Sequence, residues 1–234
     1  MRQLLTTAIG LFALVLGLQG LPAEPPIVLD NARVRVFRGT SKTLAPIIQS
    51  TAAVVVPIAD GPVRKAGEAY WTRDPARLTA AGVARTPDPA ARGAIGGDDA
   101  TLMVVVEPKR PRDVASDPSN LPPGSKPEPD RGAPGSTPGN APFVGMSFRT
   151  LFENALVSVI RARMEVHARE GFHTHAADTI VVHLSGGEIE DTAGGKTNVN
   201  RWKPGDVEFE ARGSSHSARN VGQAVDVVLV RLEP

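Results

Sequence analysis

The sequence predicts an all-β protein. Short valine-rich segments such as Ala53–Pro57 and Leu102–Val106 alternate with clusters of glycine, proline, asparagine and aspartate, a pattern typical of strands joined by turns. Between Leu156 and Val166, apolar and charged side chains alternate, as expected of a strand with one buried face. Val225–Leu232 is nearly continuous in apolar residues, which predicts a strand covered on both faces. Arg73–Ala84 is compatible with one short helix.

Composition limits the classes of function. The chain has 234 residues, of which 41% are hydrophobic and 4% aromatic, so its core must consist mainly of aliphatic side chains. Its 26 basic and 25 acidic residues leave a net charge of +1, with no basic block of the kind that binds nucleic acid. The absence of cysteine excludes disulfides, thiolate ligands and thiol catalysis.

The N-terminus has the order of a secretory signal. Arg2 precedes an apolar run, Ile9–Leu18, which is shorter than the roughly 20 residues that span a bilayer. We therefore expect residues 1–23 to be a signal peptide cleaved after Ala23, with an uncleaved membrane anchor as the alternative. Cleavage would leave a periplasmic or secreted protein with no stable membrane span.

A change in composition divides the rest of the chain. Residues 108–142 are rich in proline and glycine and have no apolar period, which predicts an exposed linker. It separates two predicted domains, at residues 24–107 and 143–234.

These two parts resemble each other weakly. Ile27–Val36 is similar to Leu151–Ile160, and Leu102–Val106 is similar to Val227–Val230. Such a repeat predicts one β architecture used twice, although any two valine-rich β domains share some of this likeness.

The histidines locate a candidate site. All five lie from His167 onward, and His173 and His175 stand two residues apart, so on a strand they point to the same side. His216 follows within a glycine- and serine-containing segment. Because neutral imidazole is the commonest metal ligand in proteins, His173, His175 and His216 are the candidate ligands of one divalent ion.

At these residues the second part resembles the cupin superfamily. The first cupin motif is represented by His173-x-His175 and by Gly186 at its closing glycine. The second motif is matched in spacing by residues that include two glycines, a histidine and an asparagine: Gly205, Gly213, His216 and Asn220. The resemblance implies two cupin-type jelly-roll barrels, joined by the linker. The first is degenerate because residues 38–52 carry no histidine.

One position departs from the cupin pattern. Thr179 stands where the motif has a glutamate, and threonine is a poor ligand for a divalent metal. Three arrangements remain open: a site of three histidines alone, recruitment of Asp178 through a local bulge, or recruitment of His183, which shares strand parity with Thr179. A metal-free, hydrogen-bonded histidine cluster is a further alternative.

Neighbouring residues have simpler expected roles. Arg212 and Arg219 flank His216 and could hold an anion, but we expect ion pairs at the rim. Trp202 and Phe209 are expected to pack in the core or rim. Asn220 is expected to order its turn through backbone hydrogen bonds.

The resemblance implies function only in outline. Iron, manganese, zinc or nickel would suit a site of imidazoles, and dioxygenase, isomerase and lyase activities all occur among cupins. The sequence identifies no general base, so the catalytic residues are unknown. A binding or sensing module for a small molecule, without turnover, is the alternative; a structural interaction protein is a third reading. The resemblance also allows a homodimer.

Overall fold

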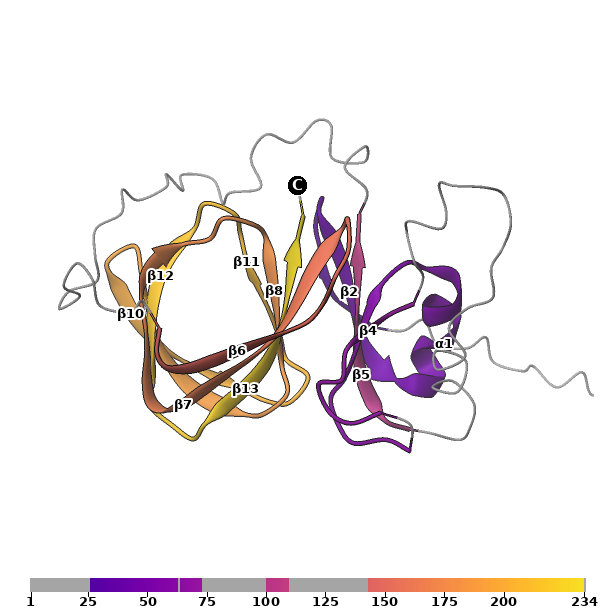
Figure 1. Cartoon of the computed structure of the whole chain (residues 1–234), viewed down its shortest axis with the longest axis horizontal. Helices are drawn as coiled ribbons and strands as arrows, with labels where there is room; N and C mark the ends of the chain where they lie inside the picture. Colours follow the sequence, from indigo (N-terminus) through magenta and orange to yellow (C-terminus); the bar gives the residue numbers. More distant parts are fainter. Residues whose placement is uncertain (1–25, 63, 73–99, 110–142, 234) are drawn as a thin grey trace, which may run out of the picture.

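A computed structural model describes residues 26–62, 64–72, 100–109 and 143–233, which form two antiparallel sheets and one helix (Figure 1). The N-terminal sheet has the order β1-β2-β5-β3-β4. Its strands are β1 (Ile27–Asp30), β2 (Val34–Thr40), β3 (Val54–Pro57), β4 (Tyr70–Trp71) and β5 (Leu102–Pro108).

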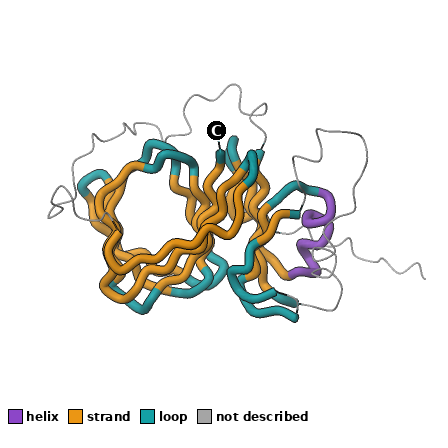
Figure 2. The backbone as a smooth tube through the Cα atoms, viewed as in Figure 1, coloured by secondary structure: helices purple, strands orange, loops and turns teal. Residues whose placement is uncertain are grey.

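The C-terminal sheet has the order β10-β9-β12-β7-β13-β8-β11, with β6 paired to β7, and it curls into a barrel (Figure 2). Its strands are β6 (Phe143–Glu153), β7 (Val157–Thr174), β8 (Thr179–His183), β9 (Gly187–Ala193), β10 (Lys196–Trp202), β11 (Val207–Glu210), β12 (Ser215–Asn220) and β13 (Val225–Leu232).

Strand β7 shapes the barrel because it pairs with two different strands along its length. Its first half pairs with β13 and its second half with β12. Between the two halves, His167 has a φ of 63°, and on the partner strand β6 Gly145 has a φ of 71°. Left-handed backbone at these positions bends the ribbon. The bend also ends the predicted alternation, so Val166 is exposed instead of buried.

The prediction of a second barrel is not confirmed. The described N-terminal residues form an open sheet, and the segment between Arg38 and Ala52 contains helix α1 (Ser41–Ser50). Thr40 caps this helix through a hydrogen bond from the backbone N–H of Thr43. Leu44 and Ile48, one turn apart, bury the helix against the sheet face that points away from the barrel (Figure 1).

The two parts share one apolar core. The other face of the N-terminal sheet packs on the outer surface of β8 and β13 (Figure 1). The residues of this layer are mainly valines with no exposed surface: Val34, Val36, Val54, Val56, Val104, Val106, Val157, Val159, Val182, Val228 and Val230. Burial of each such side chain contributes about 1.5–3 kcal/mol. The prediction that Val225–Leu232 is covered on both faces holds for one face: Val228, Val230 and Leu232 are buried in this layer, whereas Val227 and Leu229 are partly buried and line the interior of the barrel.

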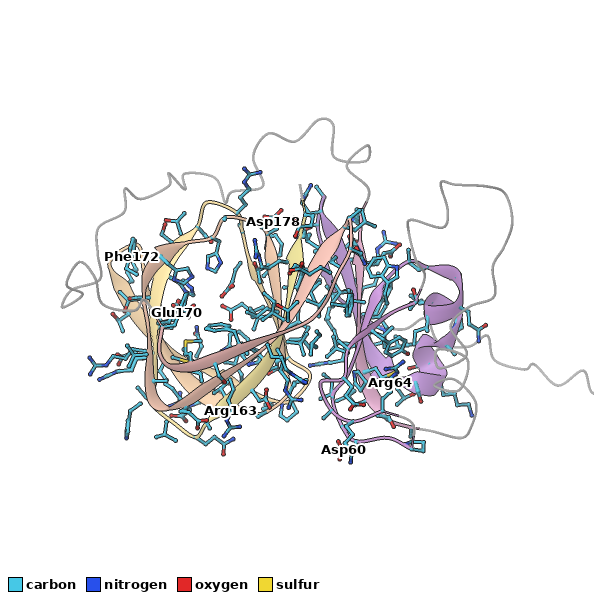
Figure 3. The ribbon with its side chains drawn as sticks, viewed as in Figure 1. Asp60, Arg64, Arg163, Glu170, Phe172 and Asp178 are labelled. Atoms are coloured by element: carbon cyan, nitrogen blue, oxygen red, sulfur yellow. The ribbon has the colours of Figure 1, made fainter. Side chains whose placement is uncertain are left out.

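Polar contacts fix the register between the parts. Arg33 Nε on the N-terminal side donates to Asp178 Oδ2 at 3.0 Å, and Arg38 Nη1 donates to Asp206 Oδ1 at 2.9 Å. Figure 3 labels Asp178 on the side of the barrel nearest the N-terminal sheet. Asp178 also accepts from the backbone N–H of Arg212 at 2.8 Å. One carboxylate therefore joins the N-terminal sheet to two loops of the barrel.

Several sequence predictions fall on residues that the structure does not describe. The signal peptide at 1–23, most of the linker at 108–142 and the helix at 73–84 lie outside the described residues. Among the helices within the described ranges, none has the length and apolar character needed to cross a membrane.

One buried polar side chain on β8 has no partner among the described residues. His183 is 3% exposed and stacks on Trp202 with ring centroids 4.5 Å apart, but neither ring nitrogen has a hydrogen bond. Burial lowers the pKa of His183 from 6.5 to about 4, against a smaller opposing effect of Asp206. The imidazole is therefore neutral at physiological pH.

The buried Arg33–Asp178 pair gives a testable prediction. Arg33→Met leaves a carboxylate that is 6% exposed without its cation, so we expect urea unfolding to show a loss of about 3 kcal/mol. The control is Arg35→Met, which breaks a pair whose side chains are 40% and 37% exposed and should cost less than about 1 kcal/mol. Equal losses in the two variants would contradict the structural role of Asp178.

His183 gives a second prediction. The unfolded chain takes up a proton at this site as pH falls through 6.5, whereas the folded chain resists until about 4, so the native state loses stability in that window. His183→Phe keeps the stack and removes the titration. We expect its unfolding free energy to fall less than that of the wild type between pH 7 and 4, by about 3 kcal/mol. Parallel pH profiles for the two proteins would count against a neutral buried imidazole.

Candidate functional site

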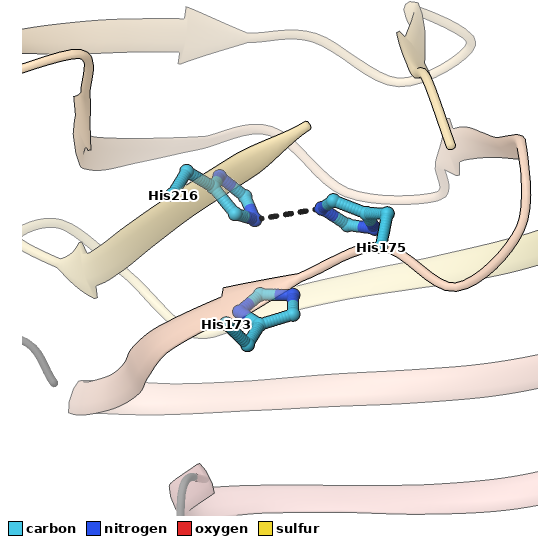
Figure 4. A group of neighbouring side chains, drawn as sticks. All are labelled: His173, His175 and His216. Atoms are coloured by element: carbon cyan, nitrogen blue, oxygen red, sulfur yellow. Dashed lines mark hydrogen bonds between the residues drawn. The ribbon is translucent and has the colours of Figure 1, made fainter. Parts of the chain in front are cut away.

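The candidate site forms where β7 and β12 end side by side. His173 lies on β7 and pairs with His216 on β12, so their side chains share the inner face of the barrel. His175 follows directly after β7. Its backbone N–H donates to Ser214 O at 2.9 Å, and its carbonyl accepts from Gly213 N–H at 2.8 Å. This continuation of the ladder brings the three predicted histidines together (Figure 4).

The distances between the rings suit a shared ion. One ring nitrogen from each of His173, His175 and His216 lies within 4.8 Å of the others. The Nε2 atoms of His175 and His216 are 3.1 Å apart, the pair joined in Figure 4. Two imidazole nitrogens that each lie about 2.0–2.1 Å from one ion are separated by about 3.0–3.4 Å at ordinary coordination angles. The donor set therefore fits a divalent metal.

The opposite ring nitrogens have partners that set the tautomers. His173 Nδ1 donates to the Gly171 carbonyl at 3.1 Å, and His216 Nδ1 donates to Asp191 Oδ1 at 2.8 Å. His175 Nδ1 lies 3.5 Å from Glu210 Oε2. When Nδ1 carries the hydrogen, the Nε2 lone pair is free to bind a metal. The contacts at Nδ1 thus orient the three rings with Nε2 toward one another, and a metal that binds there would displace the hydrogen shared by His175 and His216.

Glu210, which the motif analysis did not single out, stands beside the histidines. Its position on β11 pairs directly with Thr179 on β8, so the two side chains lie next to each other on the inner face. Glu210 Oε1 is 3.9 Å from His216 Nε2. A carboxylate therefore lies beside Thr179, one strand away, although among the described residues Glu210 is not part of the group with metal-binding spacing.

Asp178 and His183, the two residues considered as additional metal ligands, contact groups other than the three histidines. Asp178 points toward the N-terminal sheet and is engaged by Arg33 and Arg212. His183 lies four residues along β8 from Thr179 and stacks on Trp202. Among the described residues, neither belongs to the group with metal-binding spacing.

A bulge adds another carboxylate. His216 pairs with His173, whereas Ala218 pairs with Glu170, so three residues of β7 oppose two of β12. This extra residue places Glu170 and His173 on the same face although they are three apart. Glu170 Oε1 lies 3.5 Å from His173 Nε2, and Figure 3 shows Glu170 inside the barrel.

Burial and mutual charge shift the pKa values of the site strongly. Burial, followed by repulsion from His216 and His173, lowers the pKa of His175 to about 3. Burial alone would also lower the pKa of His216, but the hydrogen bond to Asp191 and the nearby carboxylates raise it to about 9. Burial raises the pKa of Glu210 to about 8 and that of Glu208 to about 7, against the opposing charge of His216.

The histidines line one part of a cavity of about 390 Å³, a volume suited to a small organic molecule. Apolar side chains make up most of the remaining wall: Phe143, Met146, Phe148, Ala162, Met164, Val181, Ile189, Trp202, Val225, Val227 and Leu229. Glu208 and Glu210 reach the cavity because they alternate on β11 with Val207 and Phe209, which pack in the shared core. This alternation was the sequence signal that could have revealed both carboxylates.

The other predicted residues have structural roles. The Asn220 side chain donates to the carbonyls of Met164, Glu165 and Gln223, which confirms that it orders the turn. Arg219 pairs with Glu190 at 2.9 Å, a partly exposed ion pair as expected.

The motif glycines adopt the backbone that requires them. Gly205 and Gly213 have φ values of 83° and 82°, in the left-handed region that favours glycine. A side chain at Gly205 would also meet Leu102 of the N-terminal sheet. Gly205 is therefore needed both for its turn and for the contact between the two parts.

No protein-family profile matches the chain, and no curated protein matches it. Solved structures with a similar fold include a cupin domain from Bordetella pertussis Tohama I, with 18% identity and a TM-score of 0.37, over 39% of this chain and 96% of that one. A cupin superfamily protein from Desulfitobacterium hafniense DCB-2 has 16% identity and a TM-score of 0.33, over 38% and 78%.

A third similar structure, a cupin 2 conserved barrel domain protein from Rhodopseudomonas palustris, has 18% identity and a TM-score of 0.35, over 44% of this chain and 72% of that one. The chain is similar to these proteins in the fold of its C-terminal barrel, which carries the histidines at 173, 175 and 216 and the glycines at 205 and 213.

Proposed function

We propose that the chain binds one divalent metal through the Nε2 atoms of His173, His175 and His216, and that it acts on a small organic molecule in the adjoining cavity. The observation that carries this proposal is the convergence of three imidazoles whose Nδ1 atoms face a carbonyl or a carboxylate. Without a metal, the Nε2 atoms of His175 and His216 are joined by a hydrogen bond, so metal binding at this position would release the proton between them.

Three imidazoles leave coordination positions open, which is the arrangement of a catalytic site rather than a closed structural one. A bound metal would supply Lewis acidity toward a substrate oxygen. Iron, manganese, zinc and nickel all suit this donor set.

The surrounding residues have separable roles. Asp191 accepts the Nδ1 proton of His216 and so orients that ring. Glu210, close to both His175 and His216, is placed to complete the ligand set in place of Thr179. Apolar side chains exclude water from most of the remaining cavity.

A second candidate function is a binding or sensing module for a small molecule without turnover. The size of the cavity favours a ligand in either case. Appearance of product during long incubation with a bound ligand would distinguish the enzyme from the sensor. We also propose export, on the signal-like sequence of residues 1–23; cell fractionation with and without those residues tests it.

The ligand assignment predicts loss of metal on single substitutions. His173→Ala or His216→Ala should reduce the metal content of untagged, purified protein from about one ion per chain to a small fraction of that, because two imidazoles bind weakly. Elemental analysis measures this. His167→Asn is the control, since His167 lies outside the cluster and asparagine tolerates its positive φ. Full metal content in both alanine variants would refute the site.

The role of Glu210 gives a separate prediction. Glu210→Gln keeps the shape of the side chain but removes the carboxyl group that a bound cation would ionise next to two ligands, so we expect metal affinity to fall about 10–100-fold in a competition titration with a chelator. Glu208→Gln, two residues away on the same strand and without contact to a histidine, should change affinity much less. Equal effects of the two substitutions would remove Glu210 from the ligand set.

A further inference from the structure

The cavity beside the histidines is rich in carboxyl groups. Its wall includes four carboxylates: Glu170, Asp191, Glu208 and Glu210. Among the described residues, Arg231 is the one lysine or arginine that lines it. Arg231 pairs with Thr179, and Thr179 pairs with Glu210, so the three share one row across the sheet.

Three of these carboxylates have a partner within the histidine cluster. Asp191 contacts His216, Glu170 contacts His173, and Glu210 contacts both His175 and His216. Glu208 differs, because within the described ranges it forms no hydrogen bond and no ion pair, and the charge of His216 acts on it without direct contact. A carboxylate enclosed among apolar side chains without a partner is unfavourable unless a ligand supplies one.

The position of Glu208 places it next to a ligand that reaches the histidines. Glu208 lies two residues before Glu210 on β11 and pairs with Val181 on β8, which in turn pairs with Leu229 on β13. Its neighbours on the inner face are therefore Val181 and Leu229. Two residues along a strand correspond to about 7 Å. This is the spacing between Glu208 and Glu210, which lies beside the histidines, and a short linear molecule can span it.

The walls of the cavity as a whole favour an alkylated cation over a hydrated metal ion. Phe143, Phe148 and Trp202 supply aromatic surface, and Met146 and Met164 supply polarisable sulfur. Aromatic rings with a nearby carboxylate are the surroundings that bind alkylammonium groups in proteins.

We infer that the cavity binds a small organic cation, with an oxygen-bearing end at the three histidines and a quaternary or alkylated ammonium-type group at Glu208. Only the position of the oxygen-bearing end, at the three histidines, depends on the proposed function. The charge recognition at Glu208 does not depend on whether a metal is bound.

Two pairs of isosteres test this inference, because in each pair a positive nitrogen replaces a neutral carbon in the same shape. Choline is compared with 3,3-dimethylbutan-1-ol, and glycine betaine with 3,3-dimethylbutanoate. Binding to the full-length protein is measured by titration calorimetry, once with zinc and once with a chelator. In the wild type we expect the member of each pair with the positive nitrogen to bind at least about tenfold more tightly than its neutral-carbon partner.

Glu208→Gln should abolish this preference, so that both members of a pair bind within about twofold of each other. Its metal content should equal that of the wild type, which separates failure of this inference from failure of the metal site. Glu165→Gln is the matched control: it removes one exposed carboxylate on β7 that pairs with Arg163, and it should leave the preference intact.

Three outcomes would overturn the inference: no binding of choline or betaine at millimolar concentration, equal binding of the isosteres by the wild type, or a preference that persists in Glu208→Gln. Persistence of the cation preference in the chelator-treated wild type, with its loss in Glu208→Gln, would support the inference even if no metal binds. Comparison of the affinities for choline and glycine betaine then shows whether an alcohol or a carboxylate binds better at the histidines.

Discussion

The valine-rich layer between the N-terminal sheet and the barrel is the constraint on which the rest of the structure depends. It buries the outer face of β8 and β13 completely, so these strands are held in place from outside the barrel. The inner face of the same strands is then not required to supply the main core. A barrel supported in this way can keep a cavity and several carboxylates inside, which a small barrel packed only on its own interior could not stabilise as easily.

The loops that carry the histidines depend on the same contact between the parts. Asp178 follows His175 by three residues and accepts from the backbone of Arg212, which precedes His216 by four. Its other oxygen accepts from Arg33 of the N-terminal part. The geometry of the histidine cluster therefore depends on a residue that touches none of the imidazoles.

Sequence reasoning located the three histidines, the turn glycines and Asn220 because these depend on local spacing and on backbone conformations that few residues adopt. It did not single out Glu170, because a regular strand would place residues three apart on opposite faces, and the bulge that reverses this is not visible in the sequence. Glu210 was missed for a different reason. Its closeness to Thr179 follows from the pairing of β8 with β11, a long-range register that motif spacing does not encode.

The N-terminal part shows where repeated patterns mislead. Its valine runs are strands, as predicted. Such runs do not distinguish an open sheet from a barrel, because valine-rich strands can be buried in either architecture. Helix α1 was also hidden, since Pro46 and the neighbouring isoleucines disfavour a helix locally. The burial of Leu44 and Ile48 against the sheet outweighs that preference.

The shared layer also bears on how this protein can be divided. Because β8 and β13 carry valines on the face that the N-terminal sheet covers, a fragment starting at residue 143 would expose a broad apolar surface to water. The barrel of this chain is thus not an interchangeable unit that could be moved to another protein unaltered. To stand alone, it would need polar side chains in place of the valines that the N-terminal sheet now covers on β8 and β13.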